Sequence, residues 1–128
     1  MKKHLFALLF LSSISGQALS AAPINLEGNY ECVGRDKQHP DTVFKGEMTI
    51  KKTGETYSIN SSFNDGGSYI GTGIYDKTKK TVSLVFTNPK DAKETGILVM
   101  DIKANGSMSN HWTYLNMKTI GQSTCTAR

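Results

Sequence analysis

The sequence predicts an all-β protein, an eight-stranded antiparallel up-and-down barrel closed by one disulfide, with a β-sandwich as the alternative. Hydrophobic residues alternate with a period of two rather than 3.6, which is the pattern of half-buried strands. Turn-forming residues separate the alternating runs at short intervals. Two cysteines lie near the two ends of the alternating region. Together these features favour one sheet that curls until its first and last strands meet.

The first half of the chain contains four of the expected strands. The second shows the pattern most clearly, since Phe44, Met48 and Ile50 fall on one face and charged or polar residues on the other. The turns expected between these strands are rich in glycine, and the Arg35–Thr42 connection is a longer loop. The four expected strands are Leu26–Gly34, Val43–Lys52, Glu55–Phe63 and Ser68–Tyr75.

The second half of the chain contains the other four. Asn105-Gly106 is the clearest hairpin signal, because both residue types tolerate positive φ. Pro89–Glu94 is expected to be the other long loop. The expected strands are Thr81–Thr87, Gly96–Lys103, Ser107–Leu115 and Ile120–Ala127.

Residues 1–20 have the pattern of a secretory signal peptide. A positive start is followed by a short apolar run and a small-residue end, and cleavage is expected between Ser20 and Ala21. Residues 21–128 are then one domain, periplasmic or secreted, with no membrane span because the apolar run is too short. An even pair of cysteines in an exported chain favours a Cys32–Cys125 disulfide, with two free thiols as the alternative. In a barrel, this bond would clamp the closing seam.

Charge and motifs argue against several functions. The formal net charge is +4, and removal of Lys2 and Lys3 with the leader lowers it by two to +2, too little to indicate a nucleic-acid partner. The sequence has no serine-hydrolase, metalloprotease or phosphate-binding motif. His39 and His111 are expected at the surface, and the acidic residues near the first loop lack the spacing of a calcium loop. We expect no catalytic residue, metal or cofactor, and therefore no enzyme.

The rhythm of glycines and aromatic residues resembles small exported bacterial barrels of the calycin type, the avidin and lipocalin architecture. The resemblance covers most of residues 21–128 and is carried by Gly28-x-Tyr30-x-Cys32-x-Gly34, Gly46-x-Met48-x-Ile50, Gly71-x-Gly73-x-Tyr75 and Trp112. It implies an eight-stranded barrel that binds a ligand at its open end. It does not imply biotin, because avidin-like sites use several tryptophans and this chain has one.

A second resemblance is to periplasmic inhibitors of c-type lysozyme. Tyr30-x-Cys32 and Cys125 fit their frame, and their inhibitory loop carries Ser-Gly-x-x-Tyr. Here Asp65, Gly66, Ser68 and Tyr69 form the matching segment, with Asp65 where that motif has serine. The resemblance implies inhibition of a hydrolase such as lysozyme.

Taken together, the sequence predicts a non-enzymatic binding protein that recognises a small molecule or a partner protein through the barrel mouth and loops. Inhibition of a hydrolase is the alternative. Tyrosine and tryptophan offer both an apolar face and a hydrogen bond, which suits such a mouth. The side chains of an eight-stranded barrel can nearly fill its interior or leave room for one small ligand, and the sequence is compatible with both. The ligand-binding candidates are Tyr30, Tyr69, Tyr75, Trp112 and Tyr114.

Overall fold

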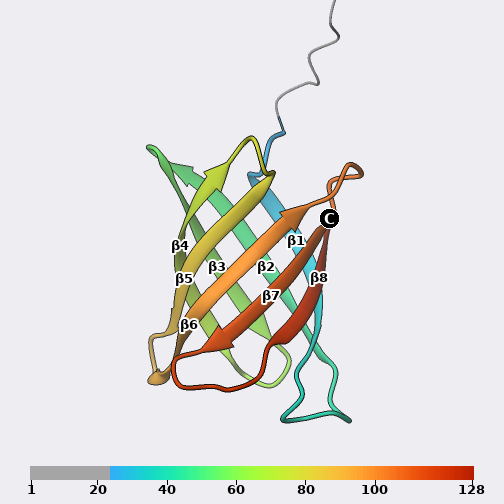
Figure 1. The fold of residues 1–128 in the computed structure, drawn as a ribbon, viewed down its shortest axis with the longest axis vertical. Coiled ribbons are helices and arrows are strands. Elements are labelled where there is room, and N and C mark those ends of the chain that lie inside the picture. Colours follow the sequence, from blue (N-terminus) through green and yellow to red (C-terminus); the bar gives the residue numbers. More distant parts are fainter. Residues whose placement is uncertain (1–23) are drawn as a thin grey trace, which may run out of the picture.

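The computed structural model describes residues 24–128, so the expected signal peptide lies outside the described residues. These residues form a closed antiparallel barrel in which each strand pairs with the next and the last pairs with the first (Figure 1). In the described part of the chain, no helix is long and apolar enough to cross a membrane. The predicted eight-stranded barrel is therefore confirmed. The strands are β1 Gly28–Arg35, β2 Phe44–Thr53, β3 Thr56–Phe63, β4 Ser68–Asp76, β5 Thr81–Asn88, β6 Asp91–Ile102, β7 Met108–Tyr114 and β8 Gly121–Ala127.

Alternation along the strands separates the barrel interior from the surface. In β5, Val82, Leu84 and Phe86 are buried, whereas Ser83 and Val85 between them are exposed. The same period of two places one face of every strand inside the barrel. The hydrophobic core is therefore the barrel lumen.

The seam between β1 and β8 carries the disulfide. Six residue pairs join these strands, from Tyr30↔Ala127 to Arg35↔Gln122. Cys32 and Cys125 are direct partners in this register, and their sulfur atoms are 1.99 Å apart. The predicted disulfide and its place at the closing seam are confirmed.

Two inward glycines lie beneath large rings. A methyl group on Gly46 would overlap the ring of Phe63, and one on Gly121 would overlap the indole of Trp112. Each glycine therefore lets a neighbouring ring lie flat against the barrel wall.

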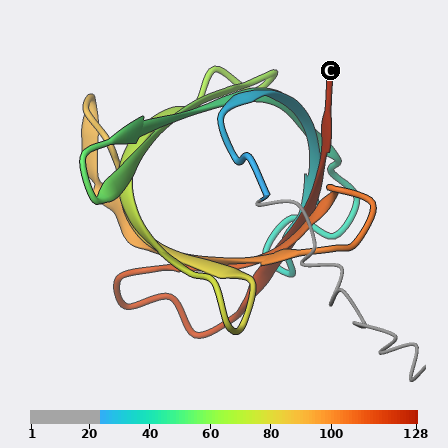
Figure 2. The ribbon, with the colours of Figure 1, turned by 90° about the horizontal axis from the view of Figure 1, so that it is seen from above.

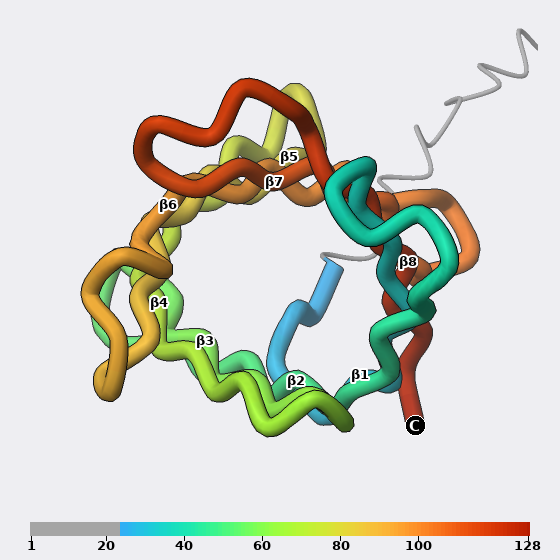
Figure 3. Tube along the Cα trace, turned by 90° about the horizontal axis from the view of Figure 1, so that it is seen from below, coloured from blue at the N-terminus to red at the C-terminus, as the bar shows by residue number. Residues whose placement is uncertain are grey.

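The segment before β1 closes one end of the barrel. Figures 2 and 3 show this blue segment turning into the ring of strands. Leu26 is 1% exposed, and its carbonyl oxygen accepts a hydrogen bond from the Tyr30 hydroxyl at 2.7 Å. Glu27 outside this plug accepts a hydrogen bond from the backbone of Lys52. The plugged end is thus tied to the sheet at two points.

The expectation of a long loop at Pro89–Glu94 is wrong. Strand β6 already begins at Asp91, which pairs with Asn88 across a two-residue turn. The next pair is Thr87↔Thr95, so residues 92–94 bulge out of the ladder. This polar stretch lacks alternation, which is why its sequence resembles a loop. The bulge matters because it positions Glu94.

Candidate functional site

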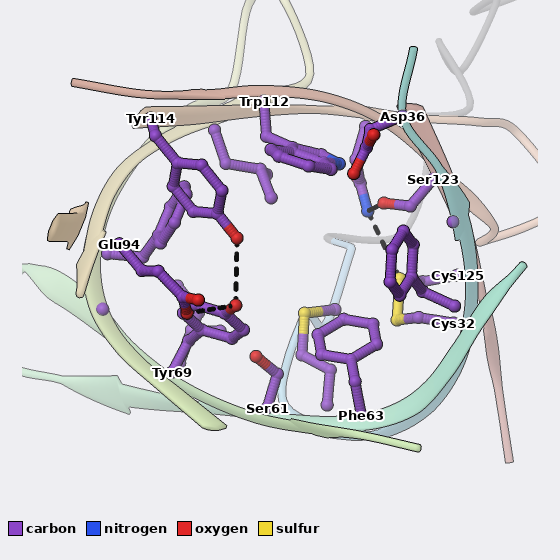
Figure 4. Close-up of a pocket in the computed structure, with 18 of the residues that line it drawn as sticks. Cys32, Asp36, Ser61, Phe63, Tyr69, Glu94, Trp112, Tyr114, Ser123 and Cys125 are labelled. Carbon is purple, nitrogen blue, oxygen red and sulfur yellow. Dashed lines mark hydrogen bonds between the residues drawn. A yellow bond between two sulfur atoms is a disulfide. The ribbon is translucent and has the colours of Figure 1, made fainter. Parts of the chain in front are cut away.

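The unplugged half of the barrel contains a cavity of about 400 Å³. Its lining includes Asp36 and His39 from the β1–β2 loop and Asp65 from the β3–β4 turn, so it lies at the end that carries these connections. The opposite end is the one that Leu26 fills. The barrel is therefore packed at the end that Leu26 fills and hollow at the other end, and Figure 4 shows the side chains that line the hollow.

Aromatic rings form an arc around the cavity. Tyr69 packs edge-on against Phe63 at a centroid distance of 6.1 Å and against Phe86 at 5.6 Å. Tyr114 continues the arc, 5.8 Å from Phe86 and 5.3 Å from Trp112. Three edge-to-face contacts and the tilted contact between Tyr114 and Trp112 hold the rings in fixed orientations. A rigid aromatic wall suits a flat apolar ligand.

A hydrogen-bonded network joins Tyr69, Glu94 and Tyr114 at one side of the cavity (Figure 4). The Tyr69 hydroxyl donates to Glu94 Oε2 at 2.7 Å and lies 2.9 Å from the Tyr114 hydroxyl. Because Tyr69 has one proton, which it gives to Glu94, Tyr114 donates to Tyr69. Asn88 Nδ2 also donates to Glu94 Oε2, at 2.9 Å. The carboxylate is therefore held by neutral donors.

Burial and this network keep both tyrosines protonated. Burial is the main cause that raises the pKa of Tyr69 far above its ordinary value, and the hydrogen bonds to Tyr114 and Glu94 raise it further. Burial also raises the pKa of Tyr114, partly offset by its bond to Tyr69 and reinforced by the negative charges of Glu94, Asp65 and Asp36. The negative charges of all three carboxylates therefore act on the Tyr114 hydroxyl inside the cavity.

The other two carboxylates have local partners. The Asp36 side chain is 7% exposed and accepts hydrogen bonds from the His39 backbone at 2.7 Å and from His39 Nδ1 at 3.1 Å. Asp65 caps its own turn by accepting from the Gly67 backbone. Within residues 24–128, the cavity lining contains no lysine or arginine. Its polar side is therefore predominantly acidic.

Asn110 places an amide deeper in the cavity wall. It is 2% exposed, and its Nδ2 donates to Ser123 Oγ at 3.1 Å and to Cys125 Sγ at 3.3 Å. A disulfide sulfur can only accept, so the amide nitrogen must face it. The Oδ1 atom has no hydrogen-bond partner. A buried carbonyl without a donor is costly and points to a missing partner.

Three of the five predicted ligand-binding aromatics line the cavity, and two do not. Tyr69, Trp112 and Tyr114 are in the lining. The expected mouth positions of Tyr30 and Tyr75 are wrong. Tyr30 is near the start of β1, and Tyr75 is near the end of β4. Because neighbouring strands are antiparallel, the starts of odd-numbered strands and the ends of even-numbered strands lie at the same end of the barrel, which is the plugged one. Tyr30 is buried there on Leu26, and Tyr75 packs against Tyr57.

The candidate inhibitory loop has its tyrosine turned inward. Asp65, Gly66 and Ser68 are exposed, and Gly66 has a positive φ of 90°. The Tyr69 side chain, in contrast, is bonded to Glu94 and Tyr114 in the cavity. Inhibition of a hydrolase through this loop stays an untested prediction, with no support from the position of Tyr69.

Sequence reasoning singled out Asp65, as part of the candidate inhibitory loop, and missed the other polar residues of the site. Glu94 is in the segment expected to be the Pro89–Glu94 loop. Asp36 belongs, with Glu31 and Asp41, to the acidic residues near the first loop, whose spacing argued against a calcium site. Glu31 from that group instead faces outward and pairs with Arg128. Asn110 had a signal, since it alternates with Met108 and Trp112 on the inward face of β7. Across residues 24–128, no group of three or more His, Cys, Asp or Glu side chains is placed to hold a metal ion.

Comparisons with known proteins support the fold. No protein-family model matches this chain, and no curated protein matches it. A similar solved structure is that of a redesigned β-barrel, mFAP0, bound to DFHBI, with a TM-score of 0.59 and 14% sequence identity. The match covers 80% of this chain and 98% of the other. At this identity the likeness shows the barrel architecture alone, which fits the calycin type loosely.

Proposed function

We propose that this protein is an exported binding protein that holds a small, mainly apolar molecule in its barrel cavity without chemical turnover. The observation that carries the proposal is the cavity of about 400 Å³, which lies within the usual size range of small-molecule sites. Its walls are largely aromatic and aliphatic, with a few polar groups at defined positions. The similar redesigned barrel bound to DFHBI supports such a use of this architecture.

Export is part of the proposal. Residues 1–20 have the pattern of a signal peptide, and the Cys32–Cys125 bond suits an oxidising compartment. His111 is exposed on the outer face of β7, away from the cavity, which agrees with binding without catalysis. His39 is in the cavity lining, where its ring is bonded to Asp36.

The proposal is tested by titrating the purified, disulfide-bonded protein with N-phenyl-1-naphthylamine, an uncharged aromatic probe that becomes fluorescent in apolar surroundings. Two adjacent serines in β3 provide a matched pair of variants. Ser61 lines the cavity, whereas Ser62 is exposed on the outer face. Ser61→Phe fills the cavity and should weaken probe binding at least about tenfold. Ser62→Phe should bind the probe as the unmodified protein does.

Two results would overturn the proposal: no probe binding at all, or equal binding by the two variants. Native mass spectrometry of protein purified from its own host then identifies any retained molecule. A retained small molecule that Ser61→Phe fails to carry would place natural binding in the same cavity.

A further inference from the structure

The charges of the cavity differ from those of the whole chain. The chain has a formal net charge of +4, yet Asp36, Asp65 and Glu94 are in the cavity lining and, within residues 24–128, no lysine or arginine joins them. Glu94 is bonded only to the neutral donors of Tyr69 and Asn88. Asp36 is paired with His39, whereas Asp65 and Glu94 accept hydrogen bonds from neutral groups. In a cavity with apolar walls, the charge of these two carboxylates acts over longer distances than in water. An anionic ligand would be repelled.

Asn110 supplies a second, independent observation. Its Oδ1 is buried, has no partner and belongs to a side chain that lines the cavity. Its Nδ2 is already used by Ser123 and Cys125, so the residue offers an acceptor and no further donor. The atom that completes it must therefore carry a hydrogen, as an N–H or O–H group does.

The aromatic arc favours the same kind of ligand. Trp112 and Tyr114 are adjacent rings in the lining, and their faces attract cations through the ring quadrupole. Figure 4 shows the Tyr114, Tyr69 and Glu94 side chains together on one side of the cavity and Asp36 and Ser123 on the other, with Trp112 between them. Acidic groups thus flank the aromatic wall on both sides.

We propose that the cavity selects a small arylalkyl amine that is cationic at neutral pH, whose N–H group bonds Asn110 Oδ1 and whose positive charge is stabilised by Asp36, Asp65 and Glu94. The inference rests on the proposed ligand-binding function and names its ligand class. It separates this barrel from carriers of fatty acids or other anions. The ring of the ligand lies against the aromatic arc, and its polar end points into the wall.

The test is calorimetric titration with three probes of nearly the same shape: 4-phenylbenzylamine, 4-phenylbenzyl alcohol and 4-phenylbenzoate, which are cationic, neutral and anionic at pH 7. The amine should bind at least about tenfold more tightly than the carboxylate, with the alcohol between them. Glu94→Gln should reduce the ratio of amine to carboxylate affinity. Asp101→Asn, on the outward face of the same strand, removes the same charge and should leave the ratio unchanged.

Asn110→Leu tests the buried acceptor. It should lower the affinities for the amine and the alcohol, both of which donate a hydrogen bond, relative to the affinity for 4-methylbiphenyl, which has no donor. Retained binding of 4-methylbiphenyl shows that the variant still forms the cavity. If Asn110→Leu does not fold, the Glu94→Gln and Asp101→Asn pair decides alone.

The outcomes distinguish the two proposals. If the carboxylate binds as tightly as the amine, or if Glu94→Gln leaves the ratio unchanged, the ligand class is wrong while a cavity that binds the naphthylamine probe stands. If neither the three probes nor the naphthylamine binds, the ligand-binding function itself fails.

Discussion

Loss of the Cys32–Cys125 bond should lower the free energy of unfolding by about 4–5 kcal/mol. The bond closes a loop over a sequence separation of 93 residues, and restricting an unfolded chain over such a loop is worth about this much. A domain of this size has a total stability on the order of 5–15 kcal/mol. The bond therefore supplies a large share of it, and the melting temperature should fall on the order of 20 °C.

The assay is urea unfolding of the double variant Cys32→Ala/Cys125→Ala, followed by circular dichroism. The same protein reduced with a phosphine serves as the comparison, because it loses the bond and keeps both sulfur atoms. The alanine variant should be less stable than the reduced protein by about 1 kcal/mol, since Asn110 loses the sulfur that accepts its hydrogen bond.

A loss below about 1 kcal/mol in the reduced protein would refute the reasoning. It would mean that the six residue pairs between β1 and β8 hold the seam unaided, or that the unfolded chain keeps its ends together without the bond.

Three further predictions follow from the barrel interior. Gly121→Ala should lower the free energy of unfolding by about 1–3 kcal/mol and shift the fluorescence of Trp112, because the new methyl group would displace the indole. In the control Gly34→Ala the methyl group would meet its nearest atoms at 3.3 Å, so the loss of stability should be smaller. Equal losses in the two variants would contradict the packing argument. The free energy of unfolding should fall as pH rises above 10.0, the ordinary tyrosine pKa, because the unfolded chain then releases protons that Tyr69 and Tyr114 retain in the folded protein. Replacing both tyrosines with phenylalanine should make this fall less steep. An unchanged pH profile in the double variant would contradict the prediction. The double variant Asn110→Leu/Ser123→Ala should have a free energy of unfolding about 1 kcal/mol higher in chemical denaturation. It removes the unpartnered Asn110 carbonyl together with the Ser123 hydroxyl that accepts from the Asn110 amide nitrogen. A loss of stability would show that the Asn110 amide supports the fold.

The strands and the seam could be predicted from the sequence because both depend on local pattern. Val82, Leu84 and Phe86 alternate with polar or exposed residues, and alternation needs no knowledge of the partner strand. The seam followed from the positions of the two cysteines once a barrel was assumed.

The site was predicted only in part, because it depends on which end of the barrel each residue reaches. Strand direction assigns Tyr69 and Tyr114 to the open end and Tyr30 to the plugged end. The ligand-binding candidates follow from residue type, which carries no information about strand direction. Which end is plugged depends on Leu26, and a single leucine before the first strand gives no signal of that role. Glu94 depends on a bulge in β6, which polar residues 92–94 conceal.

The contrast between the two halves of the barrel is an argument for function. In the plugged half, Leu26, Ile50 and Met108 are fully buried, and the Tyr30 hydroxyl has its partner. In the open half, the side chains that line the barrel wall leave a cavity between them, and the Asn110 carbonyl has no partner. An eight-stranded barrel can be filled by its own side chains, so packing alone does not require this hollow. A cavity and an unpaired buried carbonyl both lower stability, so their presence in one half supports the proposal of a ligand that fills the first and bonds the second.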